Sequence, residues 1–160
     1  MRKLEELLFR GKALNNGEEV VGRLIYYPLR SDEGQEWCCR IENGVYREFG
    51  TEICVTAKEF QAKYPIDENS GCTDVDPATV GQYSGTKDKN GKMIFEGDIV
   101  DGLFQFGLPF SAICAFKNGS FGLKWKHGGG MSFQPFACFY NVNFEVIGNV
   151  WDNPELMGTA

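Results

Sequence analysis

Residues 75–100 read VDPATVGQYSGTKDKNGKMIFEGDIV, and this stretch predicts the architecture of the chain. Asp76-Pro77 predicts a turn or the start of a one-turn helix, because Asp accepts hydrogen bonds from exposed N–H groups and Pro fits the first helical position. Lys89-Asn90-Gly91-Lys92 predicts a type I′ hairpin, since Asn-Gly tolerates positive φ at both central positions. Glu96-Gly97-Asp98 separates two apolar strands, as is common in small β-barrels, and we expect a bulge or a close backbone approach at Gly97.

Asn-Gly pairs recur along the chain and predict repeated hairpins. They begin at Asn16, Asn43, Asn90 and Asn118. Antiparallel strands joined in this way most often curl into a barrel or a sandwich. We therefore predict a mainly β fold in which antiparallel hairpins form a small SH3-like barrel or a barrel-like sheet, with one or two short helices.

The expected boundaries follow from local signals. Pro28 is expected to end the second strand, and the polar segment from Ser31 to Glu36 is expected to be a loop. Thr56 and Glu59 form a capping-box pattern that predicts a helix over residues 57–63. Asn153-Pro154 resembles the cap and first position of a short terminal helix.

Two regions are expected along the chain. Residues 65–73 form the best candidate linker. We expect residues 1–70 to be a β-rich N-terminal region, which either shares a core with the rest or stands apart. Residues 75–160 are expected to form the barrel-like region.

Composition excludes several functional classes. The chain has 160 residues, a formal net charge of −6 and 42% hydrophobic residues, so it can bury a core and does not resemble a general phosphate-binding protein. No apolar run reaches the length of a membrane helix, and Glu5 and Glu6 interrupt any signal-peptide core. We expect the protein to stay in the cytosol. Its six cysteines should then be reduced, and none forms a Cys-x-x-Cys pair.

Two separated blocks of sequence resemble the YopX family of phage and prophage proteins. The first contains Gly81-Gln82-Tyr83, Gly85, Lys87-Asp88, Asn90-Gly91 and Glu96-Gly97-Asp98. The second spans residues 144–149 and contains Gly148-Asn149. The resemblance implies a β-rich cytoplasmic protein encoded by a phage. It implies no catalytic residues, cofactor or metal site, so none is carried over.

Possible catalytic groups have simpler structural interpretations. His127 is the sole histidine and stands beside Gly128-Gly129-Gly130, which lacks the context of a phosphate loop. Cys38 and Cys39 point to opposite faces of a strand. Glu96 and Asp98 flank a glycine, where turn hydrogen bonds explain them better than acid–base catalysis. We expect no enzyme activity.

A basic segment is the best candidate for binding nucleic acid. It consists of Lys117, Lys124, Trp125, Lys126 and His127, with Lys87, Lys89 and Lys92 as further candidates. Aromatic rings between basic residues can stack on bases while the charges hold phosphates. The alternative is a solvated hairpin face with Trp125 turned into the core.

The segment from Gly102 to Phe110 is aromatic and glycine-rich. Its phenylalanines are expected mostly in the core, with Phe104 and Phe106 on one strand face, but an exposed segment would suit self-association. The sequence thus favours a non-enzymatic accessory protein that contacts a host protein, a phage protein or itself. The alternative is a small-barrel protein that binds nucleic acid.

Overall fold

The computed structural model describes residues 8–31, 34–42, 72–104, 106–139 and 142–157. Side chains are not described for residues 25–40, 42 and 72. The chain divides into two compact units, Met1–Val80 and Gly81–Ala160. The predicted division between residues 70 and 75 stays a prediction.

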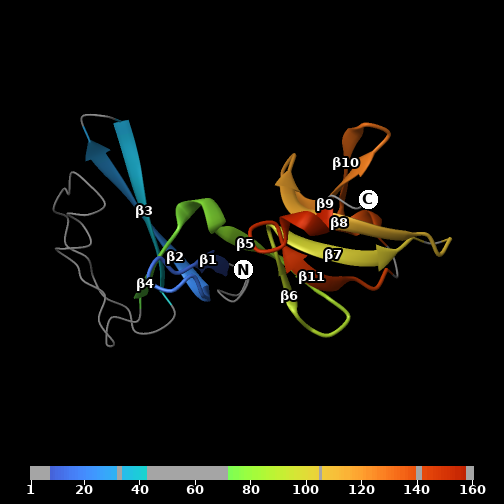
Figure 1. Cartoon of the computed structure of the whole chain (residues 1–160), viewed down its shortest axis with the longest axis horizontal. Coiled ribbons are helices and arrows are strands. Elements are labelled where there is room, and N and C mark those ends of the chain that lie inside the picture. The colour runs from blue at the N-terminus through green and yellow to red at the C-terminus, as the bar shows by residue number, and fades with distance from the viewer. Residues whose placement is uncertain (1–7, 32–33, 43–71, 105, 140–141, 158–160) are drawn as a thin grey trace. The chain divides into compact units, whose positions relative to one another are not determined.

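The N-terminal unit is an antiparallel sheet. Its described strands are β1 (Phe9–Lys12), β2 (Glu19–Ser31), β3 (Gly34–Glu42) and β4 (Cys72–Val75), in the spatial order β4-β3-β2-β1 (Figure 1). Ile41 and Val75 are fully buried at its centre. Phe9, Val20, Leu24 and Val80 pack around this pair.

A short 3₁₀ helix, η2 (Pro77–Thr79), follows β4 as the Asp76-Pro77 pair predicts. The Asp76 carboxylate accepts a hydrogen bond from the Ala78 N–H at 3.0 Å, and Pro77 occupies the first turn. The Thr79 hydroxyl oxygen accepts a hydrogen bond from the Lys12 N–H at 2.9 Å. These contacts join the helix to strand β1.

Strands β2 and β3 are longer than the sequence predicts. The expectation that Pro28 ends its strand is wrong, because β2 continues to Ser31 with Pro28 opposite Trp37. Strand β1 pairs with β2 only as far as Gly22, so β3 is the one described neighbour of β2 at Pro28. Proline has no backbone N–H group, and its absence is tolerated where a strand has no neighbour on one side. The expected loop from Ser31 to Glu36 is also wrong, since pairing extends to Ser31 and Gly34.

The C-terminal unit contains a hairpin and an antiparallel sheet. The hairpin joins β5 (Gly81–Lys87) to β6 (Met93–Phe95). The sheet has the order β10-β9-β8-β7-β11 (Figure 1), formed by β7 (Asp98–Leu103), β8 (Pro109–Lys117), β9 (Ser120–His127), β10 (Gly130–Pro135) and β11 (Glu145–Asn149). The mainly β prediction is confirmed. The strands that the structure describes do not close into a barrel, so a barrel-like open sheet is the alternative that fits.

The helices within the described residues are short. Besides η2 they are η3 (Phe136–Cys138) and η4 (Pro154–Met157), and η4 begins where Asn153-Pro154 predicts. The helix expected over residues 57–63 and the hairpin expected at Asn43-Gly44 lie outside the described residues. Among the helices that are described, none has the length and hydrophobicity to cross a membrane.

The hairpins predicted at Asn16, Asn90 and Asn118 are confirmed, but the turn type predicted at Asn90-Gly91 is wrong. At Asn118-Gly119 both residues have positive φ, 52° and 79°, as a type I′ turn requires. At Asn90-Gly91 only Gly91 has positive φ, 81°, while its N–H donates to the Asp88 carbonyl at 3.0 Å. This is a type I turn followed by a left-handed glycine, because the Asp88 side chain binds the N–H groups inside the turn.

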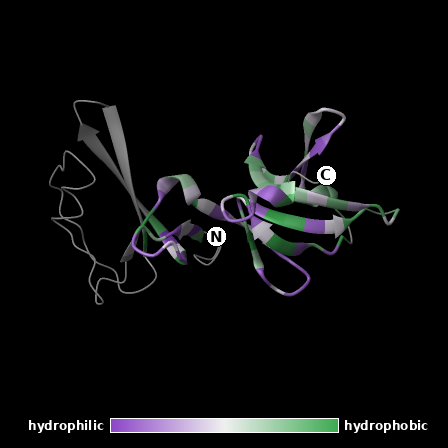
Figure 2. Ribbon diagram, viewed as in Figure 1, coloured by the Kyte–Doolittle hydropathy of each residue, from purple (hydrophilic) through white to green (hydrophobic). Residues whose placement is uncertain are grey.

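Buried and partly buried residues alternate along β8 from Phe110 to Ala115, which separates a core face from the opposite face. Figure 2 shows hydrophobic bands in green along the strands of this unit. The main buried cluster of this unit consists of Ile94, Val100, Phe110, Ala112, Cys114, Leu123 and Phe144, and Tyr83, Phe95 and Ile99 are buried as well. Val100 is paired with Ala112, and Cys114 with Leu123, so the buried residues form cross-strand rows. The intervening residues are left for the other face.

The corner at Gly97 combines close packing with a backbone conformation that glycine adopts without strain and other residues do not. Gly97 has φ 88°, and a Cβ atom there would lie 2.2 Å from the Trp151 ring. Its N–H donates to the Cys114 carbonyl, and its carbonyl accepts from the Val150 N–H, each at 2.9 Å. The expected close backbone approach therefore involves the C-terminal segment.

We predict that Gly97→Ala lowers the free energy of unfolding by at least about 2 kcal/mol, because strain at positive φ adds to the clash with Trp151. Urea unfolding followed by Trp fluorescence measures this change. Gly119→Ala is the matched control, since φ there is 79° with nothing within 4 Å of the new Cβ. It should lose only about 1 kcal/mol from backbone strain, and equal losses in the two variants would contradict the role of Trp151.

Candidate functional site

The Asp88 carboxylate connects the two blocks of sequence that resemble the YopX family. Its Oδ1 atom accepts hydrogen bonds from the Asn90 N–H at 2.8 Å and the Lys92 N–H at 2.9 Å. Its Oδ2 atom accepts from the Val146 N–H at 3.1 Å. The Lys89 N–H donates to the Phe144 carbonyl beside it. The β5–β6 turn is thereby fixed to strand β11.

Asp88 is buried, with 7% of its surface exposed. Burial by itself raises the pKa of the carboxyl group, but three backbone N–H donors and the nearby Lys92 charge outweigh it and hold the pKa below its usual value. The charged form is therefore the one that the fold stabilises.

Other motif residues in the first block also have structural roles. A Cβ atom at Gly81 would lie 2.4 Å from the Glu96 carbonyl oxygen. The Glu96 N–H donates to the Gln82 carbonyl at 2.9 Å. Tyr83 is paired with Phe95, and their ring centroids are 5.6 Å apart. The interval between Tyr83 and Lys87 contains a register shift, where Gly85 adopts a positive φ of 82°.

The remaining motif residues form the junction between β7 and β11. The Asp98 carboxylate is 1% exposed and accepts a hydrogen bond from the Phe95 N–H at 2.8 Å, as a turn role predicts. The Asn149 side-chain oxygen accepts from the Trp151 and Asp152 N–H groups. Gly148 leaves room for Asn153, whose oxygen would lie 2.5 Å from an added Cβ. The turn hydrogen bonds and the close packing at this junction therefore account for these residues without a catalytic role.

The basic segment does not form an aromatic platform between lysines. Trp125 packs against the core, with its ring centroid 6.1 Å from Phe104 and 6.4 Å from Phe139. Because side chains alternate along β9, Lys124 and Lys126 project to the opposite face. Lys117 is exposed at the end of β8, beside the Asn118-Gly119 turn. The structure thus separates the ring from the charges.

The other chemical candidates belong to different elements of the structure. His127 is exposed at the end of β9, next to Gly128 and Gly129 in a turn. Cys114 is buried and Cys138 is exposed. The side chains of Cys38 and Cys39 are not described. Over the described ranges, no three His, Cys, Asp or Glu side chains gather in a way that could hold a metal ion.

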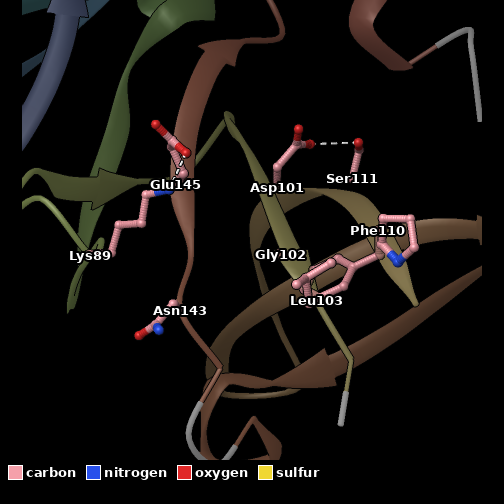
Figure 3. A pocket seen from close by; sticks show the side chains of 9 residues that line it. Lys89, Asp101, Gly102, Leu103, Phe110, Ser111, Asn143 and Glu145 are labelled. Atoms are coloured by element: carbon pink, nitrogen blue, oxygen red, sulfur yellow. Dashed lines mark hydrogen bonds and ion pairs between the residues drawn. The ribbon is translucent and has the colours of Figure 1, made fainter. Parts of the chain in front are cut away.

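A pocket of about 540 Å³ opens beside strands β7, β8 and β11 (Figure 3). Glu145 on β11 is paired with Asp101 on β7, and Asp101 is paired with Ser111 on β8. The register therefore sets these three polar side chains in one row on the face opposite the core. Lys89 forms an ion pair with Glu145, and the Ser111 hydroxyl donates to Asp101 at 2.6 Å. Leu103, Pro109, Phe110 and Asn143 also line the pocket.

The β7–β8 hairpin beside the pocket carries an exposed apolar tip, which we define as Leu103, Phe106 and Leu108. Their exposed fractions are 58%, 91% and 64%. The Gly107 N–H donates to the Phe104 carbonyl, and the Phe104 N–H donates to the Leu108 carbonyl, so the turn is hydrogen-bonded. The expectation that Phe104 and Phe106 share a face is wrong, because β7 ends at Leu103 and the turn directs Phe106 outward.

Sequence reasoning missed the polar row. The alternation Val100-Asp101-Gly102-Leu103 does place Asp101 away from the core, and Phe144-Glu145-Val146 does the same for Glu145. These local patterns carry no information on which strands become neighbours. Only the pairing of β7 with both β8 and β11 brings Asp101, Ser111 and Glu145 together.

Comparisons with known proteins identify a family and a similar solved structure. The sequence model described as "YopX protein" matches residues 8–158. The crystal structure of protein EF1440 from Enterococcus faecalis is similar, with 25% sequence identity, a TM-score of 0.49, and coverage of 94% of this chain and 97% of that chain. No curated protein matches.

We predict that Asp88→Asn lowers the free energy of unfolding at pH 7 by about 1–3 kcal/mol, because an amide has one acceptor atom where the carboxylate uses two. Since the fold lowers this pKa, the carboxylate stabilises the fold fully above the usual Asp pKa of about 3.9, and that contribution is lost as the pH falls through the lower folded value. The difference between wild type and variant should therefore shrink in acid.

Urea titrations at several pH values measure this difference. Glu155→Gln is the control, because Glu155 is an exposed carboxylate in the first turn of η4. It should change stability by less than about 0.5 kcal/mol. A difference for Asp88→Asn that stays constant from neutral pH into acid would contradict a charged Asp88 in the fold.

Proposed function

Because the chain belongs to the YopX protein family, we propose that it is a non-enzymatic accessory protein of a phage or prophage that acts by contacting another protein. The proposed place of action is the cytoplasm of the bacterial host. The observation that carries this proposal is the exposed apolar tip of the β7–β8 hairpin.

The tip has the properties of an interaction site. Three large apolar side chains are exposed close together in the sequence, and Phe106 is 91% exposed. Covering an aromatic or branched side chain of this kind gains about 1.5–3 kcal/mol. Aromatic anchors are also enriched among the residues that dominate binding energy. The chain is acidic, with a net charge of −6, but the tip offers an apolar surface that a protein partner can bury.

The tip is held in place by the core. Phe104, at the base of the turn, has its ring centroid 4.4 Å from that of Phe110 and 6.1 Å from that of Trp125. The backbone hydrogen bonds of the turn fix the positions of Phe106 and Leu108 relative to this anchor. A pre-ordered hairpin loses less conformational entropy on binding than a loose loop.

The groups in the pocket favour binding over catalysis. The Ser111 hydroxyl is held by Asp101, and a carboxylate is a weak base for activating a hydroxyl at neutral pH. The Lys89 ammonium group is paired with Glu145. Nucleic acid is a weaker candidate as partner, because Trp125 packs in the core and Lys124 points away from it.

We predict that Phe106→Ser reduces capture of the specific partner from bacterial lysate by at least about tenfold, the loss expected when a central aromatic anchor is removed. A tagged full-length chain is used, and retained proteins are quantified by mass spectrometry with and without nuclease. Met131→Ser is the matched control, because Met131 is 55% exposed on β10, which is separated from β8 by strand β9.

Two further measurements make the result decisive. Light scattering of wild type and Phe106→Ser tests self-association through the tip, and circular dichroism checks that both variants fold. A partner retained equally by wild type and Phe106→Ser would overturn the role of the tip. Loss of all retained partners after nuclease would favour the nucleic-acid alternative instead.

A further inference from the structure

We propose that the pocket beside the hairpin tip binds a Lys or Arg side chain of the protein partner, while an apolar side chain of the same partner covers the tip. This inference rests on the proposed function and specifies the chemistry of the partner. It combines the charges in the pocket, the shape of its walls and the continuity between the pocket and the tip.

The charges in the pocket favour a cation. Asp101 and Glu145 are paired across neighbouring strands, where Cβ atoms lie about 4.5–5.5 Å apart and like charges repel each other. Lys89 neutralises one of the two carboxylates by its ion pair with Glu145. Asp101 accepts a hydrogen bond from a neutral hydroxyl donor, Ser111, and none of the described basic residues forms an ion pair with it. The pocket therefore keeps one negative charge that a bound cation can compensate.

The walls of the pocket suit a long basic side chain. Leu103 and Pro109 supply apolar surface, and Gly102 adds none of its own, since a Cβ there would lie 2.7 Å from the Phe110 ring. Lys and Arg side chains place their methylene groups along apolar surface and their charged ends near polar groups. In Figure 3 the Asp101 and Glu145 carboxylates project from neighbouring strands, where such an end would meet them.

The pocket and the tip form one continuous surface. Leu103 belongs to both, because it lines the pocket and is 58% exposed at the base of the hairpin. A partner segment with an apolar residue near a basic residue can therefore contact Phe106 and Asp101 together. A phosphate group would meet two carboxylates in the same place, which argues against nucleic acid as the occupant of this pocket.

The experiment selects short peptides from a random display library for binding to the immobilised full-length chain. We expect the peptides that depend on Phe106 to be enriched in Lys or Arg next to an apolar residue. One enriched peptide is then synthesised, and its affinity for wild type and variants is measured by fluorescence anisotropy. A copy with citrulline or norleucine in place of the basic residue gives the neutral comparison.

Substitutions of opposite sign distinguish binding from structural effects. Asp101→Asn keeps an acceptor for Ser111. This variant and Glu145→Gln should each lower the affinity for the basic peptide by about tenfold, as expected for the loss of a charge-assisted hydrogen bond. Lys89→Gln frees Glu145 from its ion pair and should raise the affinity for the same peptide several-fold. Met131→Ser should leave the affinity unchanged. Mere destabilisation cannot tighten binding, so the Lys89 variant separates the two explanations.

The outcomes distinguish this inference from the function on which it rests. Peptides that require Phe106 but show no basic enrichment, and that bind Asp101→Asn as well as wild type, would overturn the cation pocket and leave the contact surface intact. If no selected peptide depends on Phe106, the tip as a contact surface is overturned, and the pocket proposal with it. Equal binding of the basic and neutral peptides would also overturn the proposed pocket.

Discussion

The carboxylate of Asp88 is the contact on which the C-terminal unit depends. It accepts N–H groups from its own turn and from Val146, which lies 58 residues further along the chain. The turn places Lys89 against β11, and β11 in turn pairs with β7 at the Gly97 corner. The two sequence blocks that resemble the YopX family therefore meet through the Asp88 side chain and the Lys89 backbone N–H group. A charged group buried without such donors would be costly, so its burial and its partners have to be retained together.

The same strand register builds both the core and the pocket. Val146, Val100 and Ala112 follow one another across β11, β7 and β8 on the core face. The adjacent residue on each of these strands faces the other way, and these residues are Glu145, Asp101 and Ser111. Because alternation couples the two rows, a slip of one residue would exchange apolar and polar faces. The packing of the core thus fixes the polar row.

Sequence patterns predict features that depend on a few consecutive residues. Two helices begin where expected, at Asp76-Pro77 and Asn153-Pro154, and the expected turn forms at Asn118-Gly119. Each of these pairs acts through its own φ angles and local hydrogen bonds. Prediction fails where a distant partner decides, as at Pro28, whose strand is extended by pairing with β3. The type I turn at Asn90 likewise depends on the burial of Asp88. The polar row could not be predicted, since the β7–β11 pairing spans a long interval of sequence.

The late position of β11 in the chain has a consequence for synthesis on the ribosome. Strand β7 pairs with β8 as soon as both have emerged, but its other edge has to wait for Glu145–Asn149. During that interval the backbone of β7 and the side of Asp88 that binds Val146 lack their native partners. Contacts of such sequence separation close slowly, and exposed strand edges attract other chains. The nascent C-terminal unit is thus most open to chaperones or to mispairing just before its last strand leaves the exit tunnel.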